Sequence, residues 1–186
     1  MKTRISFLLI IVSAFLVVAF AGVKPVQAAT ITVQDSGDGA ANATNCPGAG
    51  CRLRDALAAV SDNDTIDFSA SVTGTITLTS GQLEVNNSIT ISGPGANVLA
   101  VNGNAASRIF YINPGKTVTI AGLTITNGLA TTAIDNDGGG GGIYNDHSTL
   151  TLNNCTLSGN KAAFAAGIFN NAVGAGSATL TVKTVR

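Results

Sequence analysis

The acidic residues between positions 135 and 146 are the best candidates for chemistry in this sequence. Asp135 and Asp137 precede Gly138, and Asp146 is the twelfth residue counted from Asp135, as the last ligand of a calcium loop would be. Gly139 at the fifth position and Asp rather than Glu at the twelfth depart from that pattern. An exposed turn is therefore the competing interpretation. Asp135, Asp137 and Asp146 remain a candidate Ca²⁺ site, and we expect no other cofactor.

His147 is the single histidine of the chain and follows Asp146 directly. It is a candidate general base, with a solvated corner histidine as the alternative. Glycoside hydrolysis needs two carboxylates on opposite sides of the sugar, and lyases commonly need a carboxylate-held Ca²⁺ with a basic residue. No such constellation stands out here, so we assign no catalytic residue.

The three cysteines allow one disulfide. Cys46 and Cys51 enclose Pro-Gly-Ala-Gly, a loop that can close a bridge in an oxidising compartment. Cys155 occupies the place that Leu123 takes in an internal repeat described below, which favours a buried apolar thiol over a reactive one.

The first 28 of the 186 residues have the features of a secretory signal. A basic start at Lys2 and Arg4 is followed by the apolar run 5–23 and by small residues before a cleavage site after Ala28. An uncleaved membrane anchor is the alternative. Cleavage would remove three of the ten basic residues and none of the ten acidic ones, leaving a mature net charge of −3. Without a basic cluster, we expect no nucleic-acid partner.

Two stretches of the chain repeat one pattern. Residues 118–130 align with residues 150–162, and each copy alternates apolar residues with Thr before a turn that contains Gly and Asn. Gly-Gly-Ile-Tyr-Asn at 141–145 recurs as Ala-Gly-Ile-Phe-Asn at 166–170. Short alternating strands repeated at this spacing are typical of β-solenoids, in which like residues stack from coil to coil.

The remaining segments fit this architecture. Residues 30–33 alternate as a strand, and residues 52–60 place Leu53, Ala56, Leu57 and Val60 at helical spacing. We predict an N-terminal cap over 29–64, with a short helix covering the first coil, and β-helix coils over 65–186. At roughly 25 to 30 residues per coil the second region forms about four coils. Residues 129–140 break the period and are predicted to be a projecting loop.

The segment Cys51-Arg-Leu-Arg-Asp-Ala-Leu57 resembles the Cys-Ser-Leu-Arg-Glu-Ala signature of the CSLREA domain of bacterial exported proteins. Its motif positions are Cys51, Leu53, Arg54, Asp55, Ala56 and Leu57; Arg52 replaces Ser, Asp55 replaces Glu, and Leu57 replaces Ile. The stretches 74–78, 91–97 and 123–128 look like the coils that accompany it. The Gly-Gly-Ile-aromatic-Asn units and residues 155–160 are similar to the repeat of polymorphic outer-membrane proteins.

This resemblance implies an all-β, right-handed parallel β-helix of the pectate-lyase-like shape on secreted or surface proteins, mostly of undefined activity. Those proteins are usually longer and carry a C-terminal anchoring region, so we expect this chain to be a fragment of a longer protein. Arg54 and Asp55 are expected to tie the helix to the first coil, with a ligand pair as the alternative.

Two hypotheses for function follow. The first is a secreted or cell-surface (outer-membrane or extracellular) β-helix segment, an adhesin-like passenger without catalytic activity of its own. Its partner would be a surface receptor or a polysaccharide, its membrane contact would be through an anchor missing from this chain, and its open last coil could self-associate. The alternative is a carbohydrate-active β-helix, either a polysaccharide lyase or a glycoside hydrolase.

Overall fold

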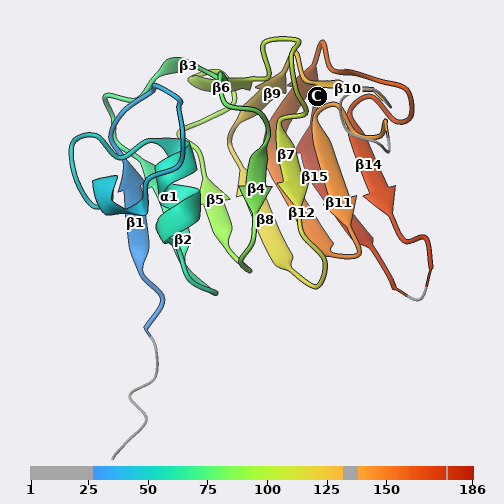
Figure 1. Ribbon diagram of the computed structural model, residues 1–186, viewed down its shortest axis with the longest axis horizontal. Helices are drawn as coiled ribbons and strands as arrows, with labels where there is room; N and C mark the ends of the chain where they lie inside the picture. Colours follow the sequence, from blue (N-terminus) through green and yellow to red (C-terminus); the bar gives the residue numbers. More distant parts are fainter. Residues whose placement is uncertain (1–26, 132–137, 175) are drawn as a thin grey trace, which may run out of the picture.

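The computed structural model describes residues 27–131, 138–174 and 176–186. Within them the protein is mostly β, and α1 (Leu53–Ala59) is the one α-helix. All the strand pairs among these residues are parallel. Figure 1 shows the strands following one another from the blue end to the red end, so later segments lie beside earlier ones. Most of the predicted leader, and both Asp135 and Asp137, lie outside the described residues.

The largest sheet has nine strands and two arms that share the long strand β12 (Thr149–Ser158). The first half of β12 pairs with β8 and β15, and its second half pairs with β9. The first arm contains β1 (Thr30–Val33), β2 (Thr65–Phe68), β5 (Thr90–Ser92), β8 (Thr117–Ala121), β12 and β15 (Thr179–Val185). The second arm contains β3 (Gly74–Thr77), β6 (Leu99–Asn102), β9 (Thr124–Thr126) and β12.

Two smaller sheets complete the β structure. One has four strands, β4 (Leu83–Val85), β7 (Phe110–Ile112), β11 (Ile143–Asp146) and β14 (Ile168–Asn171). The other pairs β10 (Leu129–Ala130) with β13 (Lys161–Ala162). The predicted loop over 129–140 therefore begins as a strand, and Gly139 near its other end bridges to Phe164. Sequence periodicity missed β10 because a two-residue strand is too short to alternate.

The pairing register confirms both internal repeats. Leu150 and Leu152 of β12 lie opposite Val118 and Ile120 of β8, the alignment that the first repeat predicts. Tyr144 of β11 lies opposite Phe169 of β14, as the second repeat predicts. Their rings are 5.2 Å apart between centroids, and the Tyr111 ring lies 5.3 Å from Tyr144 on the other side. Like residues therefore stack on like residues, which is what the repeats encode.

Aliphatic side chains from each sheet fill the interior. On the first arm the inward column includes Ile66, Ile91, Ile120 and Leu152, all fully buried. On the second arm Ile76, Val101 and Ile125 form a second buried column. Burying each such side chain contributes about 1.5–3 kcal/mol. Alternation along each strand sends the intervening Thr and Asn residues outward, because side-chain direction has a period of two.

The corner between the two arms uses left-handed backbone at matched positions. Gly122, Asn154 and Thr184 have φ of 62°, 50° and 52° and occupy equivalent places in successive strands. Only Gly, and to a lesser degree Asn, adopts this conformation without much strain. The Gly and Asn breaks in the sequence therefore mark the turns of the chain.

The helix predicted within residues 52–60 is present as α1. It lies at the blue end in Figure 1 and contacts β1 and β4. Its buried residues include Leu53, Ala56 and Leu57, three of the residues that helical spacing had selected. A short 3-10 helix, η1 (Ala43–Asn45), packs beside it.

Candidate functional site

The carboxylate of Asp146 accepts three side-chain hydrogen bonds. Tyr111 Oη donates to Asp146 Oδ2 at 2.7 Å, and Asn171 Nδ2 donates to Oδ1 at 2.9 Å. His147 Nδ1 lies 2.5 Å from Oδ1. Burial alone would raise the pKa of Asp146, but the bonds from Tyr111, His147 and Asn171 outweigh it and lower the pKa. The group is thus a carboxylate whose two oxygens already have protein donors.

Both ring nitrogens of His147 contact oxygen atoms. Nδ1 faces Asp146, and Nε2 lies 2.7 Å from the main-chain oxygen of Val173. The hydrogen bond to Asp146 is the main cause that raises the pKa of His147. In this arrangement the imidazole joins β11 to the segment after β14. Neither nitrogen is left to accept a proton from a substrate, so the general-base hypothesis for His147 gains no support from the geometry.

The structure describes only one of the three residues of the predicted calcium site. Asp146 is described, but Asp135 and Asp137 lie outside the described residues. Within the parts of the chain that the structure describes, no group of three or more His, Cys, Asp or Glu residues could hold a metal ion. The proposed Ca²⁺ site therefore stays a prediction.

A groove of about 650 Å³ lies at the corner between the two arms of the large sheet. Its wall includes Cys155, which is buried, donates to Ile120 O, and has its pKa raised by burial. A neutral thiol is a poor nucleophile, which agrees with the structural role expected for this cysteine. The groove is lined by Gly95, Ala96, Asn97, Thr124, Asn154, Cys155, Thr156, Thr184 and Arg186. This lining contains no carboxylate or imidazole and offers no acid–base pair.

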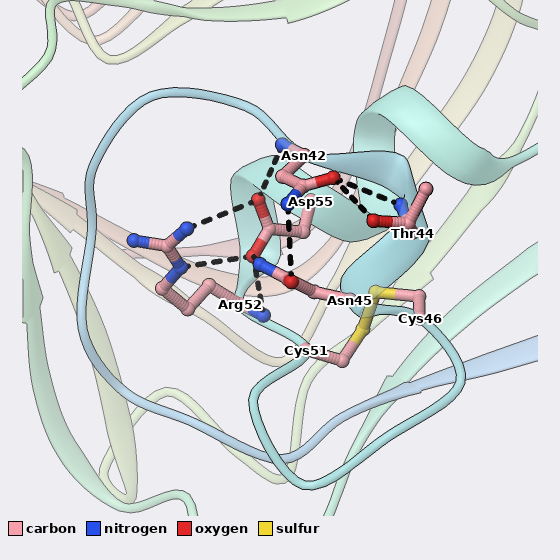
Figure 2. Close-up of a disulfide and its surroundings, with 7 residues drawn as sticks. All are labelled: Asn42, Thr44, Asn45, Cys46, Cys51, Arg52 and Asp55. Carbon is pink, nitrogen blue, oxygen red and sulfur yellow. Dashed lines mark hydrogen bonds and ion pairs between the residues drawn. A yellow bond between two sulfur atoms is a disulfide. The ribbon is translucent and has the colours of Figure 1, made fainter.

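The cap motif is built around Asp55, whose side chain is fully buried (Figure 2). Its Oδ1 accepts from the main-chain N of Asn42 at 2.7 Å, and its Oδ2 accepts from Asn45 Nδ2 at 2.9 Å and from Arg52 Nε at 2.8 Å. Burial tends to raise the pKa of Asp55, but these bonds, led by Arg52, lower it to about 2. The Asp at this motif position thus closes the loop that precedes the helix.

The predicted disulfide is present beside this network. Cys46 and Cys51 are bonded, with their Cα atoms 4.8 Å apart, and the bridge closes the loop between η1 and α1 (Figure 2). Cys51 is fully buried, and its main-chain oxygen accepts from Gln34 N at 2.8 Å. The bridge thus fixes Cys51, and the hydrogen bond from Gln34 ties this residue to the segment after β1.

Arg54 ties the helix to the β structure, as the sequence suggested. Asp55 does not share this role, because its hydrogen bonds go to the loop that precedes the helix. Its guanidinium pairs with both oxygens of Asp38 and donates to the main-chain oxygens of Gly81 and Gln82, each at 2.7 Å. Asp38 in turn accepts from Thr79 N at 2.7 Å. These bonds fix α1 against the turn between β3 and β4.

No family model, curated protein or solved structure matches this chain. The assignment of its sites therefore rests on its own geometry. No helix in the described residues is long and apolar enough to cross a membrane.

Sequence reasoning missed one buried cation, Arg108. It is 1% exposed, its Nη2 donates to Gly139 O at 2.7 Å, and its Nη1 donates to Gln82 Oε1 at 3.1 Å. The guanidinium carbon also lies 4.6 Å from the centroid of the Tyr144 ring. A single Arg directly before the apolar run 109–112 was the available signal, because a charge at the start of a buried strand requires partners. Arg108 therefore holds the main chain at residues 139–140 in place through its hydrogen bonds to their carbonyl oxygens.

Proposed function

We propose that the parallel sheets form a right-handed β-helix of about four coils, capped at its N-terminal end by α1. The support is the register on the first arm, where Thr65, Thr90, Thr119, Thr151 and Thr181 lie opposite one another in successive strands. This spaces the strands by 25 to 32 residues, about one coil each. The right-handed assignment comes from the resemblance to CSLREA-type proteins.

We infer further that the chain is a secreted or cell-surface segment, adhesin-like and without catalytic activity of its own. One observation supports the lack of catalytic activity. Among the described residues, Asp146 and His147 are the pair most like a catalytic acid and base, and their polar atoms are hydrogen-bonded to protein groups. The groove at the corner between the arms adds no carboxylate or imidazole side chain to this pair. The predicted leader supplies the argument for export.

Export is tested by the mass and location of the product. The full chain is expressed with its own leader in a bacterial host, the fractions are separated, and the intact mass is measured with and without reductant. Loss of residues 1–28 and a mass two protons lower before reduction are expected, with the product accessible to protease on intact cells or present in the medium. Retention in the cytoplasm with the leader attached would overturn the proposal.

The absence of catalysis is tested on polysaccharides. The purified protein is incubated with uronate polymers and neutral glycans, with and without Ca²⁺, and new reducing ends and unsaturated uronates are measured. No turnover above a heat-unfolded sample is expected. Turnover that disappears in Asp146→Asn would instead support the carbohydrate-active alternative. Asp62→Asn, an exposed acidic position at another turn, is the matched control.

A further inference from the structure

The outward face of the first arm carries an ordered array of hydroxyl groups. One column runs through Thr117, Thr149 and Thr179, which lie opposite one another in β8, β12 and β15. Two residues further along the same strands, a second column runs through Thr119, Thr151 and Thr181 and continues to Thr90 of β5. Ser88 adjoins the first column, since its Oγ accepts from Thr117 N. We call these eight residues the threonine array: Ser88, Thr90, Thr117, Thr119, Thr149, Thr151, Thr179 and Thr181.

The fold fixes the spacing of the array in two directions. Neighbouring strands place equivalent residues about 4.8 Å apart, and residues two apart on a strand are separated by about 6.6–6.8 Å. Threonine is branched at Cβ, so few χ1 rotamers are open to it in a strand. The hydroxyl and methyl groups therefore repeat at nearly fixed positions before any ligand arrives.

The hydroxyls of the array make no side-chain hydrogen bonds as donors to other described residues. The second arm carries a similar Thr-Ile-Thr strand, β9, in which the hydroxyl of Thr124 is engaged as a donor. Thr124 Oγ1 donates to Ala96 O at 2.6 Å, and Thr126 Oγ1 accepts from Ser158 Oγ at 3.1 Å. Thr124 thus has a protein acceptor for its hydroxyl proton, which no residue of the array has within the described part of the chain, whereas Thr75 and Thr77 of β3 are exposed like the array.

The array is also uncharged and contains no aromatic ring. Charged residues adjoin the array: Asp67 and Lys183 lie in the next outward column, opposite Thr32 and Asn153, and Asp62 Oδ1 accepts from Ser88 N at 2.7 Å. None of the eight array residues is buried. A solvated face usually carries charged side chains, whereas a sugar-binding face usually presents aromatic rings. Neither class of residue occupies these positions.

We propose that the threonine array binds the surface of ice. The distance between neighbouring strands is close to the shorter repeat of oxygen atoms on a prism face of hexagonal ice, and an uncharged face suits an uncharged lattice. Hydroxyls whose protons have no protein acceptor can join the first layer of ordered water, while the methyl groups between them hold that layer at the same spacing. This activity is additional to the passenger role and does not depend on it.

Ice itself is the probe in the test. The full chain, purified from the exported fraction, is assayed for partition into a slowly growing ice shell and for inhibition of ice recrystallisation. Thr149→Lys places a long charged side chain at an exposed position inside the array. Thr77→Lys makes the same change at an exposed position of β3, outside the array, and serves as the matched control. Thermal unfolding followed by circular dichroism verifies that each variant is folded.

We expect the wild-type protein and Thr77→Lys to enter the ice, and folded Thr149→Lys to lose partition and recrystallisation inhibition together. Thr119→Lys, in the second column, gives an independent measurement if Thr149→Lys does not fold. Exclusion of folded wild-type protein from ice, at the level of serum albumin, would overturn the proposal. Undiminished partition of the array variants would do so as well. Binding to microcrystalline cellulose or chitin but not to ice would reassign the face to a crystalline polysaccharide.

Discussion

Asn145 Nδ2 donates a hydrogen bond of 2.6 Å to Asn170 Oδ1, joining two amides that occupy the same place in β11 and β14. The preceding strand has Ile112 at this position, so the inward column changes from aliphatic to amide. Asn145 is fully buried and also donates to Ser148 O at 2.9 Å. The amide pair therefore stabilises the turn after β11 from inside the stack.

Replacing this amide should destabilise the protein. Asn145→Ala leaves Ser148 O and Asn170 Oδ1 without that donor, which lowers the free energy of unfolding by about 2 kcal/mol. Urea unfolding followed by circular dichroism measures the change. Asn86→Ala, at an exposed position, should alter stability by less than about 0.5 kcal/mol. Equal losses in the two variants would contradict a specific role for the buried amide.

Asp55 should make stability depend on pH in acid. Its pKa is about 2 in the folded protein against an ordinary 3.8, so folding favours the carboxylate. The contribution is complete above the ordinary pKa and is lost as pH falls through the folded one. At about 1.4 kcal/mol per pKa unit, this lowering of the pKa stabilises the folded protein by about 2 kcal/mol at neutral pH.

Acid titration of unfolding tests this contribution. Asp55→Asn should be less stable than wild type at neutral pH and should lose less further stability between pH about 4 and about 2. Glu84→Gln, an exposed control, should follow the wild-type curve. A parallel decline of Asp55→Asn and wild type through that window would refute the assignment.

Arg54 should contribute more to stability than any exposed cation. Arg54→Ala leaves the nearly buried Asp38 carboxylate without its partner and removes two bonds to the turn at 81–82, at a cost of about 3 kcal/mol. Arg54→Lys should recover only part of this, because an ammonium group cannot reproduce the planar fork. Chemical denaturation measures both, with the exposed Lys161→Ala as the control. Full recovery by lysine would show that charge alone matters.

The corner glycine should tolerate no side chain. Gly122 has φ of 62°, and an added Cβ would lie 2.6 Å from Gly93 O. Gly122→Ala should therefore cost about 2 kcal/mol or more, from left-handed strain and the close contact together. Asn154→Gly, at the equivalent corner one strand later, should be close to neutral because glycine adopts this φ freely. Thermal unfolding distinguishes the two, and a wild-type melting temperature for Gly122→Ala would contradict the prediction.

Periodicity along the chain determined the strands, the repeats and the cap helix. Leu150 and Val118 pair as their sequence alignment predicts, because a strand whose inward face is buried can pair well in one register only. The helix over 53–59 and the bridge between Cys46 and Cys51 are likewise local, since each depends on residues within a few positions of one another. Such patterns can be read without knowing the path of the chain.

Contacts between distant residues were decided by the tertiary structure. Arg54 reaches Asp38, Arg108 reaches Gly139 and His147 reaches Val173 across 16, 31 and 26 residues of chain. They meet because the pairing of the parallel strands and the route of each loop place them side by side, and neither is encoded in a local pattern. The same holds for the two threonine faces. Thr119 and Thr124 look alike in sequence, but only the packing of neighbouring strands and loops places an acceptor, Ala96 O, 2.6 Å from the hydroxyl of Thr124.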